Sequence, residues 1–185
     1  MQAYRERQER RARQSVPREA LSPYVYRTVY DEQNEHLPKV ITEEDLNRYL
    51  FVAASEGRLD GMRTLLDAGR DPNAATLHGD TPLMAATLAN QGDVVRVLLL
   101  RGADPNKQNT QGTTALHIAA YQGMERITQV LLHMKADPNM PNIYGDTPLM
   151  LAAAEGHITI AEMLVNAGAD VYKRNKSGMT ASDIA

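Results

Sequence analysis

A short motif that begins with threonine recurs in this chain at intervals of 33 residues. A run of small residues follows each copy, and a second apolar run comes after that. A fixed period of this length is typical of stacked helical hairpins, each of which buries its apolar face against its neighbours. The period therefore predicts an all-α solenoid, an architecture that binds other molecules rather than catalysing reactions. The four copies begin at Thr81, Thr114, Thr147 and Thr180.

The residue types within each unit fit two short antiparallel helices. A threonine hydroxyl can accept hydrogen bonds from the free N–H groups at the start of a helix. Pro82 and Pro148 come next, in the first helical turn, where a missing N–H costs nothing. Glycines at the ends of the second apolar runs suit a left-handed helix end. The expected helix pairs span about 43–55 and 59–68, 82–89 and 93–101, 115–121 and 125–134, and 148–154 and 158–167.

This pattern resembles the ankyrin repeat, in which a β-turn is followed by two antiparallel helices. The resemblance covers about residues 43–185. It implies an L-shaped ankyrin-repeat solenoid in which turn hairpins project on one side. In that family the hairpins and the inner helices form the binding surface. The units are expected at 43–75, 76–108, 109–141 and 142–174, with the start of a fifth at 175–185.

Two units depart from the pattern at positions where glycine is expected. Asn90 occupies the inter-helix slot of the second unit, and Gly92 follows two residues later. Because asparagine tolerates the left-handed conformation better than other non-glycine residues, we expect this turn to survive. Lys135 replaces the terminal glycine of the third unit, which predicts strain or an altered helix cap.

The first 42 residues differ from the repeats. Residues 1–20 form a polar, arginine-rich arm with no continuous apolar face, and we expect this arm to be flexible. Residues 21–42 contain Tyr24, Tyr26 and Tyr30, whose apolar area favours an N-terminal capping segment over the first unit, since terminal units need cover. The alternative is a segment that becomes ordered on contact with a partner.

The charge balance argues against nucleic acid as a partner of the repeats. Residues 43–185 carry twelve Lys and Arg against seventeen Asp and Glu. Phosphate binding depends mainly on positive charge, so an acidic array is a poor surface for it. No apolar run reaches the length of about 18 residues that a membrane helix needs. The N-terminus lacks the apolar core of a signal peptide, which favours a cytoplasmic location, with a periplasmic or secreted one as the alternative if a signal peptide was removed.

No motif for catalysis or metal binding is recognisable. The chain has no cysteine, and its five histidines show no metal-ligand spacing. The Asp-Pro-Asn groups between units are interpreted as turns, because Asp and Asn bond to nearby backbone. We therefore expect no enzyme activity, no cofactor and no metal. The resemblance implies that His117 forms a hydrogen bond between units, and His157 is also expected to be structural.

The concave face, formed by the hairpins and the inner helices, is the surface that the resemblance implies for partner binding. Its apolar and aromatic members are expected to form a cluster, in which Tyr121 and Tyr144 lie near each other and act as anchors. The predicted partner-binding residues are Leu77, His78, Asp80, Leu88, Gln111, Tyr121, Gln122, Ile143, Tyr144, Asp146, Lys176 and Met179.

The function expected from these observations is a non-enzymatic protein–protein interaction module that is a monomer on its own. Two alternatives stay open. One is an inhibitor or immunity-type protein that occludes an enzyme, inside or outside the cytoplasm. The other is a regulatory ankyrin fragment of a larger enzyme. The sequence does not identify the partner.

Overall fold

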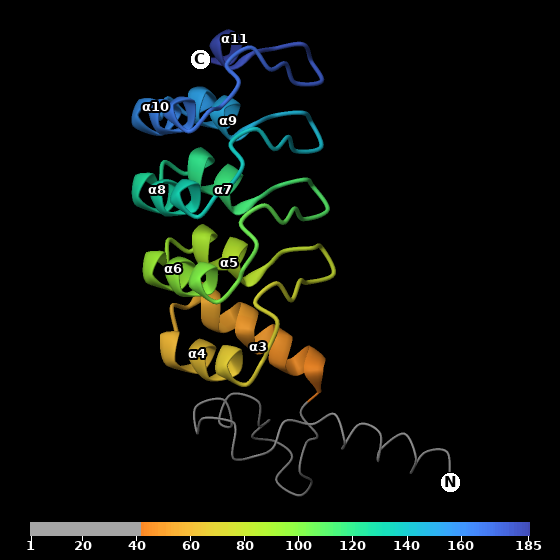
Figure 1. Ribbon diagram of the computed structural model, residues 1–185. Helices are drawn as coiled ribbons and strands as arrows, with labels where there is room; N and C mark the ends of the chain where they lie inside the picture. The colour runs from red at the N-terminus through yellow and green to blue at the C-terminus, as the bar shows by residue number, and fades with distance from the viewer. Residues whose placement is uncertain (1–41) are drawn as a thin grey trace, which may run out of the picture.

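A computed structural model describes residues 42–185, and these residues form a stack of helix pairs (Figure 1). This confirms the all-α solenoid, and each helix boundary lies within one residue of its expected position. The predicted arm at 1–20 lies outside the described residues, as does the predicted capping segment except for Thr42. The inner helices are α3 (Glu43–Ser55), α5 (Pro82–Leu88), α7 (Ala115–Tyr121), α9 (Pro148–Ala154) and α11 (Ala181–Ile184). The outer helices are α4 (Leu59–Asp67), α6 (Gly92–Leu100), α8 (Glu125–His133) and α10 (Ile158–Asn166).

A threonine N-cap begins each inner helix. In α5, for example, the Thr81 hydroxyl accepts a hydrogen bond of 3.2 Å from the Met84 N–H. The first unit starts earlier than the repeat register, at Thr42, so α3 has 13 residues whereas α5 has 7. The extra residues of α3 lie where the later units have their hairpins, as Figure 1 shows. The first helix therefore closes this end of the row of hairpins.

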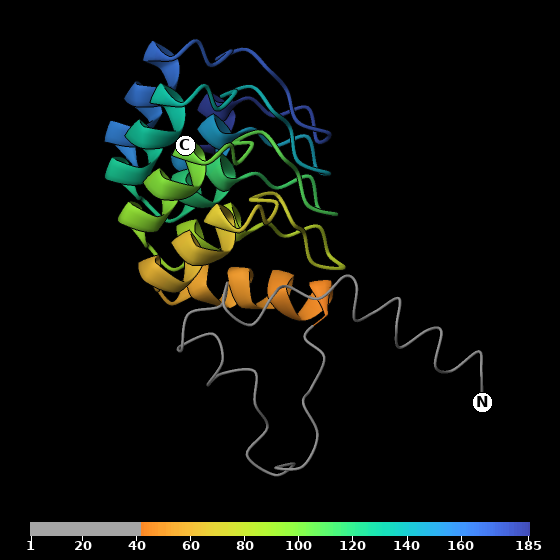
Figure 2. The ribbon, with the colours of Figure 1, turned by 60° about the horizontal axis from the view of Figure 1, so that its bottom comes forward.

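The hairpins at 76–80, 109–113, 142–146 and 175–179 lie side by side along one edge of the stack (Figure 2). One backbone hydrogen bond joins each hairpin to the next. The Ile143 N–H, for example, donates to the Gln111 oxygen at 3.0 Å. A Cβ atom at Gly112 (φ +69°) would lie 2.9 Å from the Ile143 backbone nitrogen. Glycine is therefore required there both by the conformation and by the close approach of the next hairpin.

An asparagine in the loop after each of α4, α6 and α8 hydrogen-bonds to the backbone of the next unit. Asn106 donates from Nδ2 to the Lys135 oxygen at 3.2 Å, and its Oδ1 accepts from the Asp137 N–H at 2.7 Å. Asn73 and Asn139 make the same pair of hydrogen bonds in their units. The predicted turns are confirmed as well, because each aspartate carboxylate accepts from the N–H two residues later.

The core is a row of thin layers between successive units. Small residues on the inner helices let neighbouring units approach closely, and leucines on the outer helices fill the remaining space. Leu98 and Leu131 are fully buried, and burial of such a side chain contributes about 2 kcal/mol. Met62, Met84 and Met150 were also expected in the core, and they are buried. Met163 was expected there too, but it is only half-buried because the described residues include no outer helix beyond α10.

The two departures from the glycine pattern keep the left-handed backbone. Asn90 has φ 56° and Lys135 has φ 67°, and they are the two described non-glycine residues with positive φ. The inter-helix turn of the second unit therefore survives, as predicted, with Asn90 as its left-handed residue. Gly92 does not make this turn but forms the first residue of α6.

Candidate partner-binding surface

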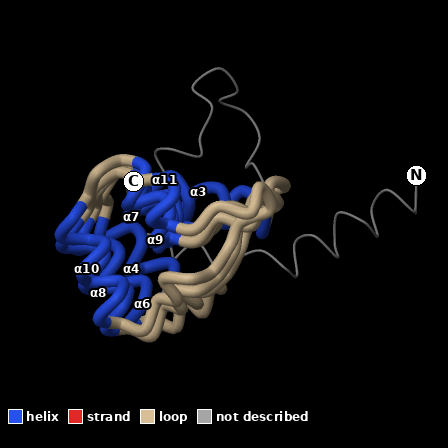
Figure 3. The backbone as a smooth tube through the Cα atoms, turned by 90° about the horizontal axis from the view of Figure 1, so that it is seen from above, coloured by secondary structure: helices blue, strands red, loops and turns tan. Residues whose placement is uncertain are grey.

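The hairpins and the inner helices share one side of the stack. Viewed down the stack, the inner helices lie between the outer helices and the projecting hairpins (Figure 3). The same order is seen from the side in Figure 1. The concave face is thus assembled from short elements that repeat from unit to unit, and many of the residues on it differ between units.

A groove of about 350 Å³ opens on this face between the last two described hairpins and the helices beside them. Tyr144 and Met179 come from the hairpins and are 63% and 40% exposed. Leu151 and Ala154 of α9 and Ile184 of α11 supply the apolar helix side of the groove. Of the predicted partner-binding residues, the structure brings Tyr144, Asp146 and Met179 together here.

Hydrogen bonds between hairpins orient the predicted aspartates. Asn175 Nδ2 donates to Asp146 Oδ1 at 2.7 Å, and Asn109 Nδ2 donates to Asp80 Oδ1 at 2.8 Å. Both carboxylates are part of half-buried residues. Each aspartate therefore has a structural role, and the carboxylate of Asp146 is also held at the edge of the groove.

The other predicted residues lie elsewhere on the same side. Leu77 is 97% exposed and lines a separate groove of about 360 Å³ beside α3. Leu88 and Tyr121 are 60% and 52% exposed at the ends of α5 and α7. The proximity of Tyr121 and Tyr144 stays a prediction. The remaining predicted residues are exposed at hairpins or at the end of α7: His78, Gln111, Gln122, Ile143 and Lys176.

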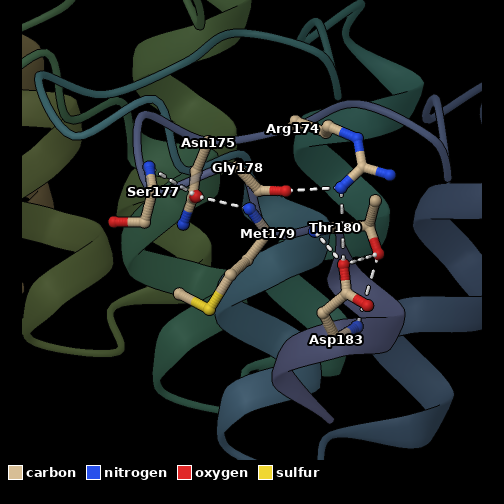
Figure 4. A network of polar contacts seen from close by, with 7 residues as sticks. All are labelled: Arg174, Asn175, Ser177, Gly178, Met179, Thr180 and Asp183. Carbon is tan, nitrogen blue, oxygen red and sulfur yellow. Dashed lines mark hydrogen bonds and ion pairs between the residues drawn. The ribbon is translucent and has the colours of Figure 1, made fainter.

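A network of hydrogen bonds fixes the last hairpin (Figure 4). Asn175 Oδ1 accepts from the N–H groups of Ser177 and Met179, both at 3.0 Å. The Asp183 carboxylate accepts from the Thr180 N–H at 2.8 Å, and this hydrogen bond, together with one from the Thr180 hydroxyl, lowers the pKa of Asp183. The backbone that carries Met179 is therefore held in place on both sides.

Sequence reasoning did not place three residues of this groove on the concave face: Met150, Leu151 and Ile184. Leu151 lies in the run of small residues that follows Thr147, and it is only half-buried. It lies three residues before Ala154, and residues at this spacing share one face of a helix. That spacing is the signal that could have placed Leu151 on the concave face.

Within residues 42–185, no three His, Asp or Glu side chains gather into a group that could hold a metal ion. In the same part of the chain, no helix is both long and apolar enough to cross a membrane.

A family model for ankyrin repeats, with three copies of the repeat, matches residues 30–109 and 83–175. The chain belongs to the ankyrin repeat family. No curated protein matches the chain. Ankyrin repeat domains are generally protein-binding modules and are typically non-catalytic. The family match over residues 30–175 consists of ankyrin repeats alone. The match begins at residue 30, within the segment predicted to cap the first unit of the ankyrin array.

Proposed function

We propose that this ankyrin array is a non-enzymatic module that binds a folded protein on its concave face. The observation that supports the proposal is the groove beside Tyr144. This tyrosine is 63% exposed, and residues of α9 and α11 line the groove with it. An exposed aromatic side chain that lines a groove is a typical anchor of a protein interface. An inhibitor of an enzyme and a regulatory part of a larger enzyme are both forms of such a module, and the identity of the partner separates them.

The lining of the groove indicates the chemistry of the partner. Leu151, Ala154 and Met179 offer apolar surface, and the carboxylate of Asp146 lies at the edge. A partner that inserts an apolar side chain and places a basic group next to it would match both features. The hairpins need little rearrangement to accept it, because backbone hydrogen bonds already order them.

The test is affinity capture of a partner with the full chain, followed by binding measurements on variants. Tyr144→Ala and Tyr121→Ala should each weaken binding by about 2 kcal/mol, roughly thirtyfold in Kd, while the melting temperature changes little. Tyr172→Ala is the matched control, because Tyr172 is 83% exposed in the loop after α10. Normal binding by both anchor variants, with loss of binding on changes in the outer helices, would show that the concave face is the wrong face.

A further inference from the structure

Gly92 is a glycine that the fold does not require. Ten of the twelve glycines in the chain have positive φ. Gly61 does not, but a Cβ there would lie 2.7 Å from Tyr49 Oη. At Gly92 the nearest atom to an added Cβ is Ile127 Cγ1, at 4.0 Å. Gly92 is the first residue of α6, and neither its backbone conformation nor a close neighbour requires glycine there.

The space that Gly92 leaves open belongs to a groove of about 440 Å³ between α6 and α8. These are outer helices, on the side of the stack away from the hairpins (Figure 1). The corresponding positions in α4 and α10 hold Leu59 and Ile158, whose side chains are much larger. The corresponding residue of α8 is Glu125. Gly92 is therefore the one residue at this position of the four outer helices that the structure describes that has no side chain, which leaves the groove beside it open.

The groove combines two free cations with an exposed apolar residue. Arg96 and Arg126 both line it, and neither forms an ion pair within residues 42–185. Leu100 is 66% exposed at a slot where α4, α8 and α10 carry polar residues. Asp93 is the acidic residue of the lining, so the two arginines leave an excess of positive charge on an array that is acidic as a whole.

The repeat register orders these groups along the groove. Arg126 lies in the first turn of α8 and Arg96 in the middle of α6, whereas Leu100 and Met134 lie at the C-terminal ends of these helices. The nine residues of α6 make a groove about 13 Å long, which accommodates about four residues of an extended peptide. The dimensions and the charge thus match a short extended peptide with acidic residues at one end and an apolar residue at the other.

We propose that this outer groove binds a short acidic segment of a second protein, with carboxylates on Arg96 and Arg126 and a bulky apolar side chain beside Leu100. Arginine binds carboxylates in a planar, two-pronged geometry, and opposite charge across the contact selects the partner. The open space above Gly92 lets the peptide backbone approach α6. This site is separate from the concave face, so one array can hold two partners at once.

The experiment is selection of short random peptides, displayed on phage, against the full chain. Enriched peptides are then synthesised with a fluorescent label, and their Kd is measured by anisotropy. We expect acidic sequences with a bulky apolar residue, and affinity that falls with added salt. Gly92→Ile fills the groove with the residue that α10 has at this position, and it should weaken binding at least about tenfold. The paired charge reversal Arg96→Glu with Arg126→Glu should do the same.

The melting temperature separates a blocked groove from a damaged fold. Gly92→Ile should leave the melting temperature about unchanged or raise it, because an added Cβ meets only ordinary contacts and the φ of Gly92 is not positive. Tyr144→Ala is the control for the concave face and should leave peptide affinity unchanged. The proposal for the outer groove would be overturned if no acidic sequence is enriched. It would also be overturned if the enriched peptides bind Gly92→Ile with normal affinity. If peptide affinity falls only in Tyr144→Ala, the proposal for the outer groove is overturned and binding on the concave face is supported.

Discussion

His117 Nε2 lies 3.1 Å from the backbone oxygen of Asp146, which belongs to the following unit. On the other side of the ring, Nδ1 accepts the Thr114 N–H at 3.2 Å. This pattern assigns the single proton of a neutral imidazole to Nε2, which donates it across the unit boundary. A second proton would have to sit on Nδ1, against the N–H that already points there. Protonation would therefore disturb the contact with Thr114, whereas Nε2 can donate to Asp146 in either state of the ring.

Acidification should destabilise the array at His117. Burial lowers the pKa of this histidine below its ordinary value of 6.5. Below about pH 6.5 the histidine of the unfolded chain therefore binds a proton, whereas the buried ring of the folded chain stays neutral to lower pH. The free energy of unfolding consequently decreases as the pH falls. We expect urea denaturation to show a lower midpoint at about pH 5.5 than at about pH 7.5.

His117→Met is the matched variant for this prediction, because Met84 and Met150 occupy the same slot in the neighbouring units. It should cost about 1–3 kcal/mol at about pH 7.5, because the side-chain hydrogen bonds to Asp146 and Thr114 are lost. It should also reduce the decrease of stability on acidification. His133→Gln, at an exposed position, should leave that decrease in place. An unchanged pH dependence in His117→Met would contradict the assignment.

Asn106→Ala should destabilise the array by about 1–2 kcal/mol, because the side chain makes two hydrogen bonds to the backbone of the next unit. The chain supplies its own control in Tyr172, which occupies the same slot after α10. No side-chain hydrogen bond of Tyr172 joins two units within residues 42–185, so Tyr172→Ala should change little. Chemical denaturation measures both variants, and equal stabilities would show that the two hydrogen bonds of Asn106 contribute nothing.

Lys135→Gly should stabilise the third unit by about 1 kcal/mol, because Lys135 holds a left-handed conformation that costs glycine little. The reverse change at the same slot of the second unit, Gly102→Lys, should destabilise by a similar amount, since Gly102 has φ 88°. Thermal melting of the two variants tests the pair. A decrease of stability in Lys135→Gly would mean that the lysine side chain stabilises the fold by more than its left-handed backbone costs.

Most of the fold followed from the sequence because a few residue types determine each unit. Thr81 and its equivalents fixed the helix starts through their caps, and the left-handed positions were visible even at Asn90. The interface role of His117 came from the family resemblance, and the hydrogen bond to Asp146 confirms it. These features are local or repeat at a fixed interval, so they can be located without coordinates.

The two proposed binding surfaces could be predicted only in part, because they use residues outside the repeat motif. Tyr144 and Met179 were expected on the concave face, but their groove also needs Leu151, whose exposure depends on how α9 packs. The outer groove depends on Gly92, which was given no binding role from the sequence and is the first residue of α6. Such sites arise from side chains of neighbouring units, and spacing alone does not show which of them stay uncovered.

Removing residues 1–41 should lower the melting temperature of the array, whereas removing residues 1–20 alone should change little. Tyr24, Tyr26 and Tyr30 offer apolar area that suits a cover over the first unit. Burial of even one such side chain contributes about 2 kcal/mol, which corresponds to a shift of roughly 5 °C for a chain of this size. The longer deletion should also promote self-association, visible in light scattering, because it exposes an apolar end. If both shortened chains have the melting temperature of the full chain, residues 21–42 do not cap the array. Their tyrosines are then free to contact a partner.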